Sequence, residues 1–386
     1  MDQREQFIRR FLANDTPMSV LCSDFGISRK TGYKWAQRFV DGGLPNLVDR
    51  SRAPHTIAHA IDEAVAQRIV ELRQRHPFWG PKKLRAWLID REPAQLWPAA
   101  STIGIILNRS GLVIPRRRRR RTPMANQPLA ACTAPNITWC ADFKGCFRVG
   151  KRYCHPLTIT DGYSRFLLRC EAMDGERCEP VRRAFEVTFR EHGLPLRVRT
   201  DNGSPFATRA VGGLSRLSVW WIKLGVTPER IQPGKPQQNG RHERMHRTLK
   251  QETTRPAKSS VLAQQDAFDR FRQSFNHERP HEALGQRTPA SVYEHSSRPM
   301  PTEPHDPEYP ADFEIRRVRK DGRMAWRGGL LCVADILANE AIGVEPIADG
   351  RWQLWFGPIY LGILQEGAKG KHTMIKNLPV TKAVDA

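Results

Sequence analysis

Three carboxylates lie in segments of the sequence where an acidic side chain is unusual and calls for an explanation. Asp142 lies in the run WCADFKG, on a predicted strand, and Asp201 lies in RTDNGSPF, where another strand ends. Glu243 lies in QNGRHERMHRTLK, at the start of a predicted helix. An acidic group at the end of a core strand is costly unless it is solvated, paired or bound to a metal. These three could converge on hard cations, which prefer oxygen ligands. A fourth, Asp161 in ITDGYSRF, is explained more simply by turn formation with the following glycine.

Basic side chains accompany Glu243 on the same predicted helix. Arg247 and Lys250 follow it at the fourth and seventh positions, so the three side chains share one face. A carboxylate that could bind a metal, beside cations that could bind phosphate, suits the cleavage of a nucleic acid. Asn239, just before the helix, is a further candidate for contact with a DNA backbone.

The same helix start also matches a different kind of site. The run from His242 to His246 reads H-E-x-x-H, in which two histidines at i and i+4 bind zinc and the glutamate acts as a base. However, Arg241, Arg244 and Arg247 surround these histidines, and three nearby cations disfavour a zinc dication. A phosphate backbone is the better partner for the arginines. We expect the histidines to be DNA contacts or structural groups.

The overall charge indicates a polyanionic partner. The chain has 386 residues, with 62 Lys and Arg against 40 Asp and Glu, a formal net charge of +22. Such an excess attracts a polyanion at long range, and DNA or RNA is the commonest one. No long apolar run or basic amphipathic anchor supports a membrane instead. The 8 cysteines form no C-x-x-C pair and the N-terminus is charged, so we expect reduced thiols in a cytoplasmic protein.

Residues 1–53 predict a helix-turn-helix domain. Gly26 allows a sharp turn and Ser28 can cap the helix that follows it. The second helix carries side chains suited to phosphates and base edges in a major groove, namely Arg29, Lys30, Thr31, Tyr33 and Lys34. An ordinary small helical bundle with a solvated basic face is the alternative.

Residues 54–115 predict a second helical, helix-turn-helix-like DNA-binding domain. Helices are expected over 61–75 and 82–88, and Ser101 is expected to cap a third. A basic linker covers 116–131, and it begins with six consecutive arginines, namely Arg116, Arg117, Arg118, Arg119, Arg120 and Arg121. Like charges this dense cannot pack in a core. We expect contact with a minor groove or phosphates, with a solvated tether as the alternative.

From residue 132 the pattern changes to strands. Successive β-rich runs, then a helix and a further strand, predict a mixed sheet flanked by helices over 132–298. A proline-rich stretch, 299–310, is predicted to be a linker. Residues 311–386 contain two Asp-Gly pairs, which are strong hairpin signals, and predict a small β-barrel with a tail.

Together these segments resemble the DDE transposases of bacterial insertion sequences, whose catalytic core is similar to that of retroviral integrases. The resemblance rests on the strand aspartate, the TDNGSPF run and the Q-N-G-x-x-E-R helix start. It extends outward to the preceding helix-turn-helix and to NHERPHEALGQRTPASVY at 276–293. The spacing from Asp201 to Glu243 is longer than is usual in this superfamily, and we place the extra length near LSRLSVWW. Glu229 and Glu252 are therefore the alternative third acids.

The resemblance implies a multidomain α+β fold with N-terminal helix-turn-helix units, a ribonuclease-H-like α/β catalytic core and a small C-terminal β-barrel. It also implies a Mg²⁺-dependent DNA endonuclease and strand transferase. Asp142 would bridge two Mg²⁺ ions, with Mn²⁺ as a substitute, while Asp201 and Glu243 would each hold one. The protein would bind transposon ends, cleave the DNA and join the 3′-hydroxyl ends to target DNA. Double-stranded DNA is the implied partner, a homo-oligomer is expected because two ends must meet, and the bacterial protein would associate with the nucleoid.

Three other interpretations are weaker. His55 and His59 have the spacing of half a zinc site, but no cysteine pair follows to complete four ligands. His295, Arg298 and Tyr309 resemble parts of a tyrosine recombinase site, yet they lie in or beside the proline-rich stretch, a poor place to hold catalytic geometry. A non-catalytic DNA-binding regulator would use the N-terminal third alone and would leave the three carboxylates without a purpose.

Overall fold

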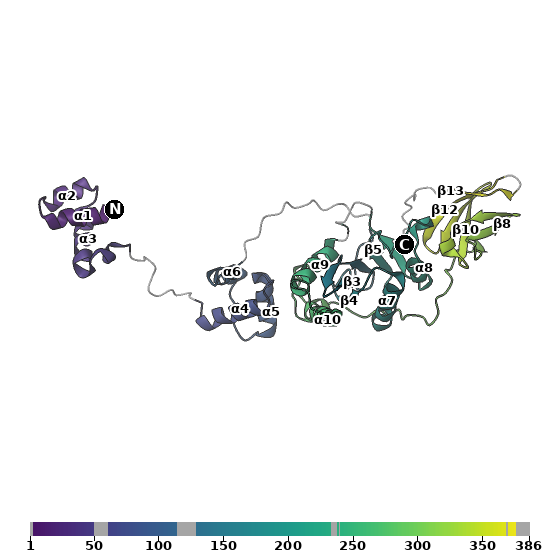
Figure 1. Ribbon diagram of the computed structural model, residues 1–386, viewed down its shortest axis with the longest axis horizontal. Coiled ribbons are helices and arrows are strands. Elements are labelled where there is room, and N and C mark those ends of the chain that lie inside the picture. The colour runs from purple at the N-terminus through teal and green to yellow at the C-terminus, as the bar shows by residue number, and fades with distance from the viewer. Residues whose placement is uncertain are drawn as a thin grey trace. The chain divides into compact units, whose positions relative to one another are not determined.

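The computed structural model describes residues 3–49, 61–113, 129–232, 238, 240–367 and 370–375 (Figure 1). The chain divides into two compact units, Met1–Asp62 and Glu63–Ala386. The finer domain division predicted above stays an interpretation. Several candidates lie outside the described residues, namely His55, His59, Arg116, Arg117, Arg118, Arg119, Arg120, Arg121 and Asn239.

The first unit is a three-helix bundle, with α1 at Gln3–Ala13, α2 at Met18–Asp24 and α3 at Arg29–Gly42. Ser28 caps α3 as predicted, because its hydroxyl accepts a hydrogen bond from the backbone N–H of Thr31 at 3.2 Å. Gly26 has φ +61°, which supplies the turn between the two helices. At Gly32 a Cβ atom would stand 2.4 Å from the Cys22 sulfur, so glycine is what lets α3 pack closely on α2.

Three more helices open the second unit. They are α4 at Glu63–Arg75, α5 at Pro81–Arg91 and α6 at Ala100–Arg109, packed around Ile69, Leu84 and Ile103. Pro81 begins α5, where its missing N–H costs no hydrogen bond. The predicted Ser101 cap is wrong. The capping position of α6 is Ala99, which has no side-chain cap, because the helix begins one residue before Ser101.

A six-stranded mixed sheet forms the central region. Its strands are β1 (Thr138–Phe143), β2 (Phe147–Val149), β3 (Arg152–Asp161), β4 (Leu167–Met173), β5 (Arg197–Thr200) and β6 (Thr227–Arg230). The order is β2-β3-β1-β5-β6, with β4 also paired to β3. β1 pairs antiparallel with β3, whereas β1, β5 and β6 run parallel. This mixed arrangement is the predicted ribonuclease-H-like type of core.

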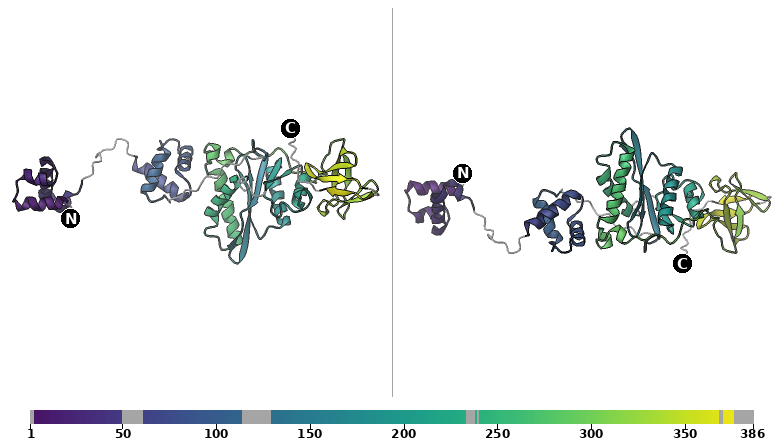
Figure 2. Two further views of the ribbon diagram at one scale, coloured as in Figure 1. Left: turned by 90° about the horizontal axis from the view of Figure 1, so that it is seen from above. Right: turned by 90° about the horizontal axis from the view of Figure 1, so that it is seen from below.

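Helices cover both faces of this sheet (Figure 2). They are α7 (Cys178–His192) and α8 (Arg216–Lys223) on one face, and α9 (Gly240–Thr253) and α10 (Val261–His277) on the other. Alternation along β1 sends Trp139 and Ala141 into the α7–α8 core, so Cys140 and Asp142 face α9. The LSRLSVWW stretch supplies α8, the crossover helix between the parallel strands β5 and β6, so it belongs to the core architecture.

The C-terminal region is not a closed barrel, and the β-barrel prediction is wrong. Its larger sheet has the order β13-β12-β11-β10-β7, from strands β7 (Glu314–Arg317), β10 (Ala341–Ala348), β11 (Arg351–Phe356), β12 (Ile359–Gln365) and β13 (Thr373–Ile375). Strands β8 (Arg323–Trp326) and β9 (Gly329–Cys332) form a separate hairpin. Closure would require the two edge strands to pair. Within the described residues, β7 ladders only with β10 and β13 only with β12. Both Asp-Gly turns are present, with positive φ at Gly322 and Gly350.

This open sheet packs on the central region. Val219 and Ile222 of α8 share a hydrophobic cluster with Ile342 and Leu361 of the sheet. The stretch 299–310 lies along the same junction, where Tyr309 donates a hydrogen bond to the Ala341 carbonyl at 2.9 Å. No helix within the described residues is long and apolar enough to cross a membrane.

Candidate active site

Asp142 and Asp201 lie at the same level on two neighbouring parallel strands. Cys140 of β1 pairs with Arg199 of β5, and each aspartate comes two residues after its member of that pair. Neighbouring strands are about 5 Å apart, so the two carboxylates leave the sheet side by side. Asp201 follows directly after β5, and its Oδ1 accepts a hydrogen bond from the Gly203 N–H at 3.0 Å. The Asn-Gly turn thus orients this carboxylate.

Glu243 reaches the same place from the first turn of α9. The evidence is the pKa of Asp142, which is raised to about 7, first by burial and then by the charges of Asp201 and Glu243. The Asp142 side chain is only 21% exposed, which makes its ionisation costly. The structure therefore brings all three predicted carboxylates within electrostatic reach of one another. The sequence predicted a strand, a strand end and a helix start for these residues, and the parallel pairing of β1 with β5 is what the prediction lacked.

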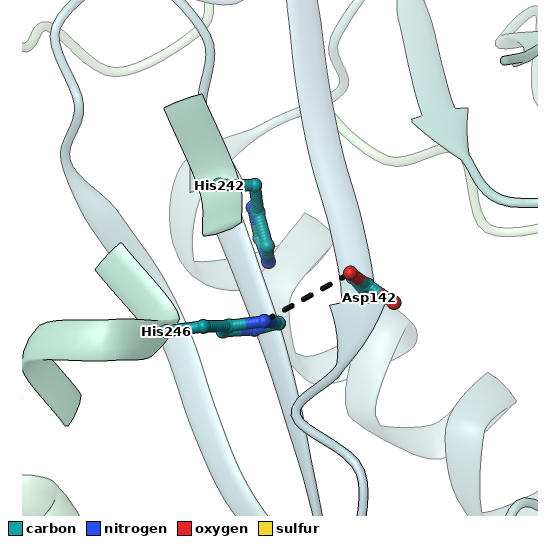
Figure 3. A group of neighbouring side chains, drawn as sticks. All are labelled: Asp142, His242 and His246. Atoms are coloured by element: carbon teal, nitrogen blue, oxygen red, sulfur yellow. Dashed lines mark ion pairs between the residues drawn. The ribbon is translucent and has the colours of Figure 1, made fainter. Parts of the chain in front are cut away.

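Two buried histidines lie beside Asp142 (Figure 3). His242 and His246 are 2% and 6% exposed. Their Nε2 atoms both lie 2.7 Å from the Thr158 hydroxyl, and the His242 Nδ1 lies 2.9 Å from the Thr160 hydroxyl. The Thr158 hydroxyl also lies 3.1 Å from the Asp142 carbonyl oxygen, to which it can only donate. The threonines alternate along β3, and this alternation in PLTIT was the overlooked signal.

Counting the hydrogen-bond donors and acceptors of this cluster assigns the tautomers of His242 and His246. Thr158 has one hydroxyl hydrogen, which goes to the carbonyl, so both Nε2 atoms must donate to its oxygen. The His242 Nδ1 then accepts from Thr160, and the His246 Nδ1 carries a lone pair 3.9 Å from the Asp142 Oδ2. Burial lowers the pKa of His242 to about 3 and that of His246 further, which keeps both rings neutral.

The cluster does not resemble a zinc-protease site. Asp142, His242 and His246 do offer three ligand atoms close together. Both nitrogens of His242, however, are engaged by threonine hydroxyls, so neither is free to bind zinc. Because the rings are buried, they are structural groups and not DNA contacts. The part of our expectation that had them touching DNA is wrong.

The carboxylates fit a hard divalent cation. Burial first, and then the charges of Asp201 and Glu243, raise the pKa of Asp142, a cost that a bound divalent cation would relieve. Lys144 opposes this shift only weakly and is itself half-buried, with its pKa lowered by burial and by Lys250. The donor set therefore matches Mg²⁺ or Mn²⁺ better than a soft metal.

Comparison with known proteins identifies the family to which this chain belongs. The integrase core domain family matches residues 133–236 and, through a second description of the same domain, residues 224–289. A 31.7 kDa protein of insertion element IS407 from Burkholderia multivorans is 32% identical over 231 residues, 59% of this chain and 80% of that relative. The chain belongs to the insertion-element transposases with an integrase core.

One further relative and two solved structures are also similar to this chain. A 39.2 kDa protein of insertion element IS476 from Xanthomonas euvesicatoria is 29% identical over 59% of this chain and 64% of its own length. The catalytic core domain of HTLV-2 integrase, solved with magnesium, is 16% identical over 42% of this chain and 99% of that one, at a TM-score of 0.34. The integrase of a simian T-cell lymphotropic virus intasome gives 16% identity and a TM-score of 0.37 over 74% of this chain and 91% of its own. Structural likeness at these scores carries no argument about mechanism.

The family assignment supports a nuclease and strand-transferase core of the kind that uses divalent metals. It also supports the N-terminal prediction, because a helix-turn-helix family matches residues 3–55 and a homeodomain-like family matches 31–107. On α3 of the transposase, Arg29, Lys30, Tyr33 and Lys34 are exposed. Thr31 is half-buried, and its hydroxyl contacts Ser28 at 3.0 Å as part of the helix cap.

The cations of α9 lie as the sequence predicts. Glu243, Arg247 and Lys250 are all exposed on one side of the helix, whereas Met245 and Leu249 are buried on the other. The apolar side fixes the helix on the sheet. The charged side is left free to face a polyanion.

The alternative acids have structural partners elsewhere. Glu229 pairs with the buried Arg199 at 2.6 Å, and Glu252 pairs with Arg279 at 2.7 Å. Asp161 accepts hydrogen bonds from the N–H groups of Asn136, Tyr163 and Ser164 and from the Ser164 hydroxyl, which confirms its role in a turn. None of these three is among the groups that shift the pKa of Asp142.

The residues of the recombinase interpretation also have structural partners. His295 lies 3.1 Å from the Glu191 carbonyl, and Arg298 donates to the carbonyls of Pro195 and Gly225. The Tyr309 hydroxyl is bound to backbone at the C-terminal sheet, so it is not a free nucleophile. All 8 cysteines are free in the structure.

Proposed function

We propose that this transposase binds the ends of its own insertion element, cleaves the DNA there and joins the 3′-hydroxyl ends to target DNA. The observation that carries the proposal is the convergence of Asp142, Asp201 and Glu243 at one edge of the sheet. Burial and these two neighbours raise the pKa of Asp142 to about 7, which favours a divalent ion in its place. Two Mg²⁺ ions, or Mn²⁺ in their place, would activate the attacking oxygen and stabilise the leaving oxygen of an in-line displacement at phosphorus.

Each carboxylate has a distinct task in this proposal. Asp142, central and least exposed, would contact both ions, while Asp201 and Glu243 would each hold one. Arg247, Lys250 and Asn239 would bind the DNA backbone beside them. His242 and His246 of α9 both contact the hydroxyl of Thr158 on β3. This shared contact holds α9 in a fixed position relative to the strand of Asp142.

The N-terminal part would supply recognition. Arg29, Lys30, Tyr33 and Lys34 would read the element ends from α3, and Arg116–Arg121 would add phosphate contacts that depend on salt. Since two ends must be held together, the transposase would act as a homo-oligomer on double-stranded DNA.

The test is strand transfer by the full chain with Mg²⁺, on duplexes copied from the DNA that flanks the gene. Asp142→Asn, Asp201→Asn and Glu243→Gln should each reduce cleavage and joining by roughly three orders of magnitude or more, and double variants should lose little beyond that. Binding to the ends, measured by gel shift in EDTA, should persist. Glu179→Gln, an exposed acid on α7, is the matched control and should remain active.

Two outcomes would overturn the proposal. An Asp142→Asn transposase that still joins ends would exclude the carboxylate mechanism. End binding without any cleavage by the wild type, under conditions where Mg²⁺ binding is measured directly, would leave a DNA-binding regulator instead.

A further inference from the structure

A pocket lined by three arginines opens beside the catalytic face, at the opposite end of β1 from Asp142. Its volume is about 460 Å³, and its basic lining residues are Arg165, Arg241 and Arg287. Tyr163 and Cys132 line it as well, together with the loop at 283–285. We call it the three-arginine pocket. No carboxylate lines it.

Backbone carbonyls hold these guanidinium groups in place. The Nη1 atoms of Arg165 and Arg241 both donate to the carbonyl of Gly162, the second of these at 3.3 Å. Gly162 is itself fixed, because its N–H donates to the Thr138 carbonyl of β1 at 2.9 Å. Arg287 donates to the Leu284 carbonyl at 3.3 Å. A carbonyl orients a cation without neutralising its charge.

The positive charges of these three arginines lie close to one another and are not paired with described carboxylates. Within the part of the chain that the structure describes, none of the three arginines forms an ion pair with a carboxylate. Burial, and then Arg241 and Arg244, lower the pKa of Arg165 to about 10. Arg165 and Arg241 share the single carbonyl of Gly162, and Arg287 donates to that of Leu284, so all three charges stay uncompensated by these contacts. Several cations fixed around a concave surface form a binding site for an anion.

We propose that the three-arginine pocket binds one phosphate of the DNA strand that passes over the catalytic carboxylates. This proposal rests on the proposed function, since it assumes that DNA lies at Asp142. Thr138 precedes Asp142 by four residues on β1, a distance of about 13 Å along the strand. One strand of duplex DNA rises about 3.4 Å per nucleotide along the helix axis, and its phosphates wind around that axis, so the bound phosphate lies a few nucleotides from the cleaved bond. A phosphate bound in the pocket fixes the position of the DNA strand along the active site.

The first experiment measures binding without chemistry. Full-length Arg241→Gln and Arg287→Gln are titrated with an end duplex in EDTA at several salt concentrations. Each should flatten the dependence of log affinity on log salt by about one, the value for one lost phosphate contact. Arg241→Lys, which keeps the charge, should restore most of the slope. Arg183→Gln, an exposed arginine of α7, is the control and should leave the slope unchanged. Thermal melting shows whether each variant is folded.

The second experiment locates the phosphate. A single neutral methylphosphonate is moved along the strand around the cleaved bond. For the wild type, one substitution a few nucleotides away should weaken binding, and Arg241→Gln should be insensitive to that substitution alone. Equal losses in wild type and variant at every position would overturn the proposal. A second result would also overturn it. Inorganic phosphate would raise the melting temperature of the wild type and not of Arg241→Gln, while both proteins bind the duplex equally well. Neither readout requires catalysis, so both results are independent of the Asp142→Asn test.

Discussion

The two faces of the central sheet are built in different ways from the same strands. Toward α7 and α8, β1 and β3 present Trp139, Ala141, Leu157 and Ile159, all of which are fully buried in one apolar cluster. Toward α9, the alternate residues are largely polar, and they include Asp142 and the threonines that bind the two histidines. The first face uses non-directional burial. The second adds directional hydrogen bonds to an apolar cluster around Met245, Leu249 and Phe268, and these bonds fix where side chains point but make each lost partner expensive.

This difference teaches where stability and function reside in the transposase. An apolar face tolerates changes that preserve volume, because its attraction has no preferred direction. A polar face tolerates only changes that keep every buried donor and acceptor satisfied. Four predictions sharpen or break this contrast.

The largest effect on stability is expected on the apolar face. Phe185 of α7 is fully buried and packs against Trp221 with ring centroids 4.8 Å apart. Phe185→Ala should lower the free energy of unfolding by about 3–5 kcal/mol, because it removes buried area and leaves a cavity. Strand transfer per folded molecule should change little. Val187→Ala, at a 40% exposed site on the same helix, is the control in denaturant titrations. A loss of activity in folded Phe185→Ala would break the proposed separation of the two faces.

The next effect is expected from the polar face. Thr158→Val keeps the volume but leaves both buried His Nε2 donors without their partner, at a cost of about 3 kcal/mol. Thr158→Ser keeps the hydroxyl and should recover most of that loss. Activity per folded molecule should fall in the valine variant only, because Asp142 and α9 lose their common support. If both variants unfold alike, the hydroxyl is not what holds this face together.

A smaller effect follows from the pKa of Asp142. Between its ordinary value of 3.8 and about 7, the unfolded chain releases the Asp142 proton while the metal-free folded chain keeps it. The folded state then binds more protons, so this group makes stability fall as pH rises through that window. The full shift in pKa is equivalent to about 4 kcal/mol, and partial solvent exposure of the side chain reduces it. Asp142→Asn should therefore match the wild type near pH 4 and exceed it by about 2 kcal/mol near pH 8.

The difference between variant and wild type is the quantity to measure in that experiment. His242, neutral when buried, has its pKa lowered to about 3 and drives stability the opposite way, upward with pH. Subtracting the two unfolding curves removes the histidine contribution. A flat difference from pH 4 to pH 8 would mean that Asp142 ionises normally in the fold.

The smallest signal is the proton released when Mg²⁺ binds. Near pH 6.5 the raised pKa leaves Asp142 substantially protonated, so metal binding must displace part of that proton. Calorimetry in two buffers of different ionisation enthalpy should report release of up to about one proton at pH 6.5 and much less at pH 8.5. Asp142→Asn should abolish the release. Equal release at both pH values would contradict the coupling between the ion and this carboxylate.

Local signals explain most of what could be predicted from the sequence. The Ser28 cap and the Asp-Gly turns depend on a few adjacent residues, and all of them are present. The Ser101 cap failed because the capping position, Ala99, lies only two residues earlier, an offset that no local pattern resolves. The barrel failed because closure depends on whether distant edge strands meet, which no local pattern encodes.

For the candidate site, the sequence by itself determined the identities of the three carboxylates and the elements that carry them. Alternation along a strand and periodicity along a helix suffice for that, since both are short-range properties of the backbone. Only the tertiary structure decided that Asp142 and Asp201 stand level on parallel strands, because register is set by pairing across a long stretch of chain. It also decided that His242 and His246 turn inward to Thr158, and that Arg165, Arg241 and Arg287 share a pocket. Those contacts join segments far apart in the chain, and the packing of the whole core determines them.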